Sequence, residues 1–125
     1  MATGNLDMTR VSLALIGFGH VGRAFVRLLD AKRALLRKEH GLTWRVTGIA
    51  TRRHGGALDP QGLDTVEALR LVESNQPLTS LSTRPIPDDV GEFLRQSQAQ
   101  VLFGAPPSGD SRWGRQPMAN TKAVA

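Results

Sequence analysis

Three glycines in the stretch GFGHVG, namely Gly17, Gly19 and Gly22, are the residues of this chain best suited to binding a ligand. They fit the spacing G-x-G-x-x-G, in which each glycine has a mechanical role. The first permits a tight turn, the second lets a phosphate group approach the backbone, and the third lets a helix pack closely on a strand. Backbone amides of residues 20–22 would point at the phosphates from a helix N-terminus. The pattern therefore predicts a site for the pyrophosphate of a dinucleotide.

The residues on either side of these glycines predict the elements that must hold the turn. Residues 11–16 form a short apolar run, typical of a parallel strand buried on both faces. From residue 20 to residue 40 apolar residues recur at helical spacing, and Gly41 can end that helix in a left-handed conformation. Residues 44–50 predict a second strand. Strand, glycine turn, helix and strand form a βαβ unit, although a turn that uses its glycines only for packing remains the alternative.

The residues that follow the second strand, Thr51-Arg52-Arg53, bear on which dinucleotide is bound. An acid at this place bonds the ribose hydroxyls of NAD, whereas an arginine can accommodate the 2′-phosphate of NADP. The two arginines favour NADP, with NAD left open because adjacent arginines on a loop are commonly solvated charge. The predicted cofactor-binding residues are Gly17, Phe18, Gly19, His20, Val21, Gly22, Thr51, Arg52 and Arg53.

Helix signals continue beyond this unit. Asp64, with a glutamate three residues later, predicts the N-cap of a second helix of about three turns. Three prolines in residues 74–87 predict an irregular connection. Asp89 begins a third helix in the same way, and residues 99–103 supply a third strand.

These elements together predict an α/β fold: an incomplete Rossmann-type parallel sheet of about three strands with flanking helices. Residues 1–10 are expected to form an N-terminal tail, and residues 11–104 the dinucleotide-binding domain. Residues 105–125, rich in proline and glycine, are expected to be loosely ordered. An unfinished sheet edge predicts low stability or self-association.

The composition narrows the classes of function. The 125 residues hold 16 basic and 11 acidic side chains, and the net charge of +5 favours anionic partners. A nucleic-acid binder is disfavoured, because aromatic residues are only 5% and tyrosine is absent. Cysteine is absent and the three histidines are not spaced as metal ligands, so no metal site is predicted. No signal peptide or apolar membrane span is recognisable, which makes the cytoplasm the expected location.

Four phrases resemble, in order and spacing, the N-terminal nucleotide-binding domain of homoserine dehydrogenase. They are LIGFGHVGRAFVRLL, EHGLTWRVTGIATRRHG, LDTVEAL and VLF, and the resemblance covers about residues 11–103. It implies an NAD(P)-dependent oxidoreductase that interconverts homoserine and aspartate 4-semialdehyde, on the route to threonine and methionine. Hydride transfer in the family needs a second, substrate-binding domain with the catalytic lysine and acids. The resemblance therefore implies a truncated relative or fragment that binds the dinucleotide and is inactive alone.

The chain departs from the family after VLF. The family has an acid there, then one residue, then Thr-Pro near the nicotinamide, whereas this chain has Gly104, Ala105, Pro106 and Pro107. Lys122 lies in a phrase that only superficially matches the family's catalytic strand, so no catalytic residue is predicted.

Three hypotheses follow. The first is the dinucleotide-binding domain of a homoserine dehydrogenase-like enzyme. The second is a non-enzymatic nucleotide-binding or interaction module, which self-associates or pairs with a chain that supplies the missing substrate domain. The third, least favoured, is a basic nucleic-acid binder.

Overall fold

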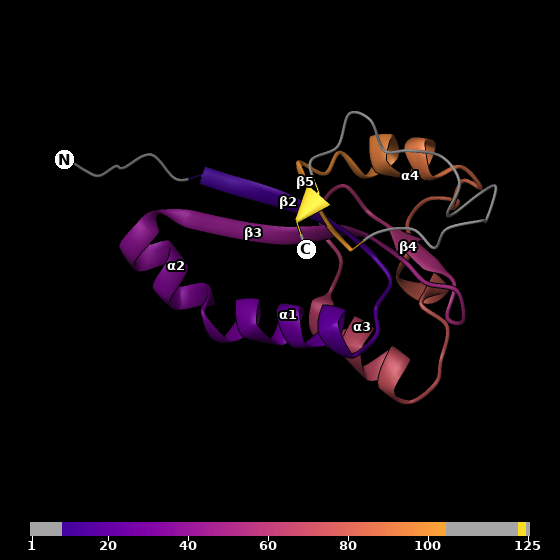
Figure 1. Ribbon diagram of the computed structural model, residues 1–125, viewed down its shortest axis with the longest axis horizontal. Coiled ribbons are helices and arrows are strands. Elements are labelled where there is room, and N and C mark those ends of the chain that lie inside the picture. Colours follow the sequence, from indigo (N-terminus) through magenta and orange to yellow (C-terminus); the bar gives the residue numbers. More distant parts are fainter. Residues whose placement is uncertain (1–8, 105–122, 125) are drawn as a thin grey trace.

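The computed structural model describes residues 9–104 and 123–124, and these form a sheet with helices on both faces (Figure 1). The strands lie in the order β4-β3-β2-β5-β6. Their bounds are β2 Thr9–Ile16, β3 Leu42–Ala50, β4 Gly56–Leu58, β5 Val101–Gly104 and β6 Ala123–Val124. The Rossmann-type α/β class predicted from the sequence is confirmed.

The three predicted strands are the parallel centre of this sheet. β2 pairs with β3 on one side and with β5 on the other, both in parallel. β2 begins at Thr9, so two residues that the sequence assigned to an N-terminal tail belong to the sheet. Residues 11–16 of β2 are nearly all apolar, and they suit the middle of the sheet because both faces are covered there.

Two short strands that the sequence pattern did not predict extend the sheet at its edges. β4 pairs antiparallel with β3 directly after the polar loop at residues 51–55. β6 adds two residues parallel to β5. These two residues belong to the segment 105–125 that was predicted to be loosely ordered, and the rest of that segment lies outside the described residues. Edges this short offer little template for pairing with another chain.

The helix predicted over residues 20–40 is divided at Lys32. Its parts are α1 His20–Ala31 and α2 Arg33–His40, which ends at Gly41 in the left-handed conformation (φ 60°). The bend at Lys32 places the Arg33 guanidinium over the Trp44 ring, 4.0 Å from the ring centre. Leu36 likewise packs against the core. Tertiary contacts with β3 therefore override the uninterrupted helical pattern of the sequence.

Two further helices begin as predicted, each at an aspartate. The Asp64 carboxylate accepts a hydrogen bond from the Glu67 amide (3.1 Å) at the start of α3 Thr65–Glu73. Asp89 does the same at the start of α4 Val90–Ser97. The connection between them is irregular apart from a single 3-10 turn, Thr79–Leu81. On α3 the hydrogen bond from Arg70 holds the pKa of the exposed Glu67 carboxyl below its ordinary value.

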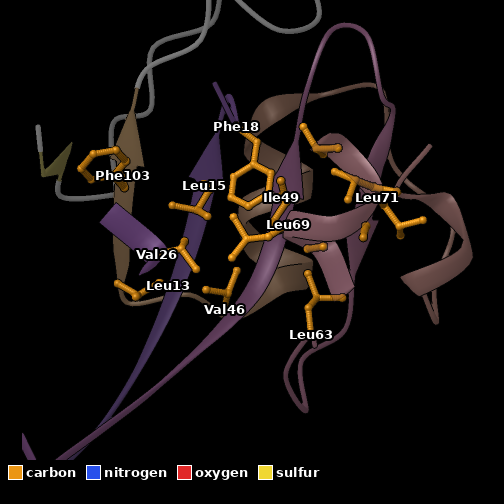
Figure 2. Packing of buried hydrophobic residues seen from close by; sticks show 14 of the residues in the cluster. Leu13, Leu15, Phe18, Val26, Val46, Ile49, Leu63, Leu69, Leu71 and Phe103 are labelled. Carbon is orange, nitrogen blue, oxygen red and sulfur yellow. The ribbon is translucent and has the colours of Figure 1, made fainter. Parts of the chain in front are cut away.

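The helices divide the core between the two faces of the sheet. α1, α2 and α3 cover one face and α4 covers the other (Figure 1). The larger apolar cluster lies beneath the first three helices, and Figure 2 shows Phe18 between Leu15 and Ile49 within it. The smaller cluster lies under α4 and centres on Phe93, which is fully buried.

One irregularity decides which residues of β3 face which cluster. The register of β3 against β2 shifts by one residue at Thr47, whose buried hydroxyl donates to the Leu13 carbonyl (3.3 Å). Side chains three positions apart on a strand ordinarily face opposite sides. Because Thr47 is an extra residue, Val46 and Ile49 both belong to the larger cluster.

Candidate functional site

The glycine turn lies where β2 ends, between the carboxyl ends of the parallel strands. Gly17 has a φ of 90°, a conformation that side chains rarely adopt, and its amide donates to the Ala50 carbonyl of β3 (2.6 Å). Gly19 is the N-cap of α1, and a Cβ added there would meet no atom of the chain within 4 Å. A Cβ on the buried Gly22 would lie 3.2 Å from the Gly17 carbonyl oxygen. Gly17 thus permits the turn, Gly19 leaves the backbone open to a ligand, and Gly22 lets α1 pack closely on the turn.

A cleft of about 380 Å³ opens beside this turn. It is lined by Gly17, Phe18, Gly19, His20, Arg23, Thr51, Arg52, Arg53, His54, Val72 and Asn75. Seven of the nine predicted site residues are brought together here from two segments more than 30 positions apart. The carboxyl edge of a parallel sheet is where open α/β folds bind their ligands.

Two predicted residues do not line the cleft. The Val21 side chain is 72% exposed, and it is absent from the lining. Gly22 is buried beneath the turn, where its contact with Gly17 lets α1 pack on β2. Of these two, Gly22 can affect a ligand only through the shape of the turn.

The second wall of the cleft is the loop after β3, which its own hydrogen bonds hold in place. The Thr51 hydroxyl donates to the Gly55 carbonyl (2.7 Å) and accepts from the His54 amide (2.8 Å). The His54 ring is hydrogen-bonded through Nε2 to Asn75 Oδ1 (3.1 Å), which ties the loop to the end of α3. The arginines at positions 52 and 53 are exposed on this ordered turn.

Four cleft residues were not among the predicted site: Arg23, His54, Val72 and Asn75. The Arg23 side chain is only 18% exposed, and its Nε donates to the Gly19 carbonyl (3.1 Å). The only sequence signal for it was its position directly after the glycine motif. Val72 and Asn75 carried no such signal, because only the packing of α3 brings them to the turn.

The charge of the lining suits an anion. Three arginines and two histidines line the cleft, and no carboxylate does so among the residues that the structure describes. Glu73 stands just outside the lining, 3.6 Å from the Arg23 guanidinium. The described residues contain no group of histidines and acids able to hold a metal ion. Phosphate recognition is therefore the chemistry that the cleft supports.

Gly104 closes β5 at the same edge of the sheet, in register with Ile16. Its φ is 94°, and an added Cβ would overlap the backbone carbonyl oxygen of Ile16. This backbone therefore admits no side chain at Gly104, the position where the sequence departs from the acid of the homoserine dehydrogenase pattern.

We compared the chain with family models and with curated proteins. No family model matches the chain. A curated protein, the NAD(+)-dependent homoserine dehydrogenase of Pseudomonas canavaninivorans, is 32% identical over 74 residues, which are 59% of this chain and 21% of that protein. The chain is homologous to homoserine dehydrogenases. The match falls in the N-terminal domain of those enzymes.

Solved homoserine dehydrogenases have the same fold. The NADPH complex of a hyperthermophilic archaeal homoserine dehydrogenase superposes with a TM-score of 0.59 at 23% identity, over 76% of this chain and 28% of that one. The enzyme of Thermoplasma acidophilum superposes with a TM-score of 0.56 at 21% identity, over 82% and 28%. The chain thus spans about a quarter of the homoserine dehydrogenases it matches.

No helix within the described ranges is long and apolar enough to cross a membrane.

Proposed function

We propose that this chain is the NAD(P)-binding domain of a homoserine dehydrogenase-like oxidoreductase. The observation that carries the proposal is the cleft in which the glycine turn after β2 meets the arginine loop after β3. An open approach at Gly19 and a lining rich in arginine are what a pyrophosphate requires.

Each part of the cleft has a role in this proposal. Backbone amides at the start of α1, around His20, bind the pyrophosphate with the positive end of the helix dipole behind them. Phe18 is buried in the core and holds the turn from beneath. The loop Thr51-Arg52-Arg53 faces the adenosine ribose. The bound dinucleotide would supply the hydride that the reaction transfers.

NADP is the proposed dinucleotide, with NAD as the alternative. Arginine at the end of the second strand suits a 2′-phosphate, because its guanidinium bonds phosphate oxygens in a planar, two-point geometry. The relatives include both kinds: the Pseudomonas enzyme is NAD(+)-dependent, and the hyperthermophilic archaeal enzyme binds NADPH. The relatives therefore do not decide between the two dinucleotides, and the proposal of NADP rests on the arginines of the loop after β3.

Conversion between homoserine and aspartate 4-semialdehyde is proposed for the assembled enzyme. Proton transfer to or from the substrate requires a general acid or base within hydrogen-bonding reach. Among the described residues the cleft contains no lysine or carboxylate, so these groups must come from outside the described residues. We propose that a further domain or chain supplies them, in a protein located in the cytoplasm.

The test is a calorimetric titration of the folded chain with NADPH and then NADH. Saturable binding of both, with NADPH preferred, is expected. Gly19→Val should weaken both affinities by about a hundredfold or more, because the side chain fills the approach to the backbone, while its Cβ lies within 4 Å of no other atom of the described chain. Val66→Ala, at an exposed residue of α3 outside the cleft, should change neither.

Gly19→Ser is a second variant in case the valine disturbs the fold, because serine is a favoured N-cap. Its circular dichroism should match the parent, and its affinity should fall between the two. Absence of binding by the folded parent chain, or unchanged affinity in both Gly19 variants, would leave the glycines with a packing role only and favour a non-enzymatic interaction module.

A further inference from the structure

Arg23 lines the cleft, and the proposed function gives it no role so far. It is the first residue after the glycine motif and lies in the first turn of α1. Its side chain is mostly buried although it carries a charge. Arginine is well suited to phosphate, because its guanidinium is always charged and its N–H groups match pairs of phosphate oxygens. The surroundings of this side chain therefore bear on what the cleft binds.

The Arg23 side chain is folded back onto the glycine turn. Long side chains of a helix lean toward its N-terminus, over the preceding turn. The Gly19 carbonyl accepts hydrogen bonds both from the Arg23 amide (2.9 Å) and from the Arg23 Nε (3.1 Å). This double contact fixes the guanidinium at the turn whose amides, around His20, are proposed to bind the pyrophosphate.

The terminal nitrogens of Arg23 lie toward the end of α3. Nη1 is 3.6 Å from the Glu73 carboxylate, which is longer than a hydrogen bond. The same Glu73 oxygen already accepts a hydrogen bond from Arg27. Within the part of the chain that the structure describes, no acceptor is hydrogen-bonded to either Nη of Arg23. One carboxylate shared by two guanidinium groups leaves a positive charge in excess beside the cleft.

The position of Arg23 distinguishes it from the other two cleft arginines. Arg52 and Arg53 belong to the loop after β3, which is proposed to face the adenosine ribose. Arg23 is held on the glycine turn instead. A purely structural role, support of the turn through Gly19, is the alternative. A neutral hydrogen-bond donor would suffice for that role, so the two explanations differ in whether the charge is needed.

We propose that Arg23 binds the pyrophosphate of the dinucleotide through its terminal N–H groups, beside the backbone amides of the turn. The inference rests on the proposed dinucleotide binding and adds a side chain to it. Because NADP and NAD share the pyrophosphate, Arg23 contributes equally to the affinity for both, unlike the arginines of the loop after β3.

The test is titration calorimetry of the full 125-residue chain with NADPH, NADH and ADP-ribose, which all contain the pyrophosphate. Arg23→Gln should weaken all three affinities by about tenfold or more, because glutamine can still donate to Gly19 but carries no charge. Arg23→Met is a second neutral variant and should lose as much. Arg23→Lys keeps the charge and should stay within about threefold of the parent. Circular dichroism should be unchanged in each variant.

Arg37→Gln is the matched control, since it removes the same charge from an exposed arginine of α2 outside the cleft. It should leave every affinity within about twofold. Unchanged affinity in the neutral Arg23 variants, or a loss in Arg23→Lys as large as theirs, would overturn this inference while leaving the proposed function intact. So would a loss confined to NADPH, which would assign Arg23 to the 2′-phosphate, or an equal loss in Arg37→Gln. Absence of binding by the folded parent chain would overturn both proposals.

Discussion

At the scale of single residues, glycines set what the carboxyl edge of the sheet can hold. Gly17 provides a backbone conformation, Gly19 provides space, and Gly104 avoids a clash. Arginines then provide the charge, with Arg23 fixed against the turn and Arg52 at the rim. Shape and charge are therefore supplied by different residue types.

The arginine loop predicts a difference between the two dinucleotides. Replacing Arg52 and Arg53 together by alanine should weaken NADPH binding about tenfold or more and leave NADH within about twofold, because only NADPH carries the 2′-phosphate. Titration calorimetry measures both affinities. Arg95→Ala, on the helix that covers the opposite face of the sheet, is the control. An equal loss for the two ligands would exclude a role in recognising the 2′-phosphate.

Gly104 predicts an effect on stability. Gly104→Ala should lower the free energy of unfolding by about 2 kcal/mol or more, because alanine is strained at this φ and its Cβ overlaps the Ile16 carbonyl. Urea denaturation followed by circular dichroism measures the change. The comparison is Gly19→Ser at the same edge, where the added side chain has space and stability should change by less than about 1 kcal/mol. Equal stability of the two variants would contradict this account.

At the scale of elements, the helices behind the cleft are held by local caps and by contacts with distant strands. Asp64 and Asp89 satisfy backbone amides that would otherwise lack partners at the starts of α3 and α4. The break at Lys32 is different, since it follows from the packing of α2 on β3.

The caps predict matched losses of stability. Asp64→Ala and Asp89→Ala should each lower the free energy of unfolding by about 1 kcal/mol, and asparagine at either position should restore most of it. Thermal or urea unfolding measures both. Asp88→Ala, at the exposed residue beside Asp89, removes a carboxylate that does not cap the helix. A loss as large in that variant would point to net charge instead of capping.

At the scale of the whole molecule, the two clusters stabilise a sheet that holds the cleft at its carboxyl edge. The cluster under α4 is the smaller one and depends on Phe93, which fits against the backbone at Gly48: a Cβ there would lie 2.9 Å from the Phe93 ring. A small second cluster has few residues with which to compensate for a lost ring.

The loss of that ring should therefore affect the entire fold. Phe93→Ala is expected to lower the free energy of unfolding by about 3–5 kcal/mol, a large part of the 5–15 kcal/mol typical of native proteins. Urea denaturation followed by circular dichroism measures the loss. Val66→Ala, at an exposed side chain, should change stability by less than about 0.5 kcal/mol. A loss below 1 kcal/mol for Phe93→Ala would show that the cluster under α4 contributes little.

The sequence by itself determined the βαβ unit, the glycine turn, the end of α2 at Gly41 and the two aspartate caps. The turn, the helix end and the caps depend on residues within a few positions of one another, so local chemistry suffices to specify them. The βαβ unit joins strands more than 30 positions apart, and it was predicted from the order of strand, glycine turn, helix and strand along the chain. Only the tertiary structure decided the break at Lys32, the extra residue at Thr47 and the edge strands. It also brought Val72 and Asn75 into the cleft. Those outcomes depend on which surfaces of distant segments meet, and the spacing of residues along the chain does not contain that information.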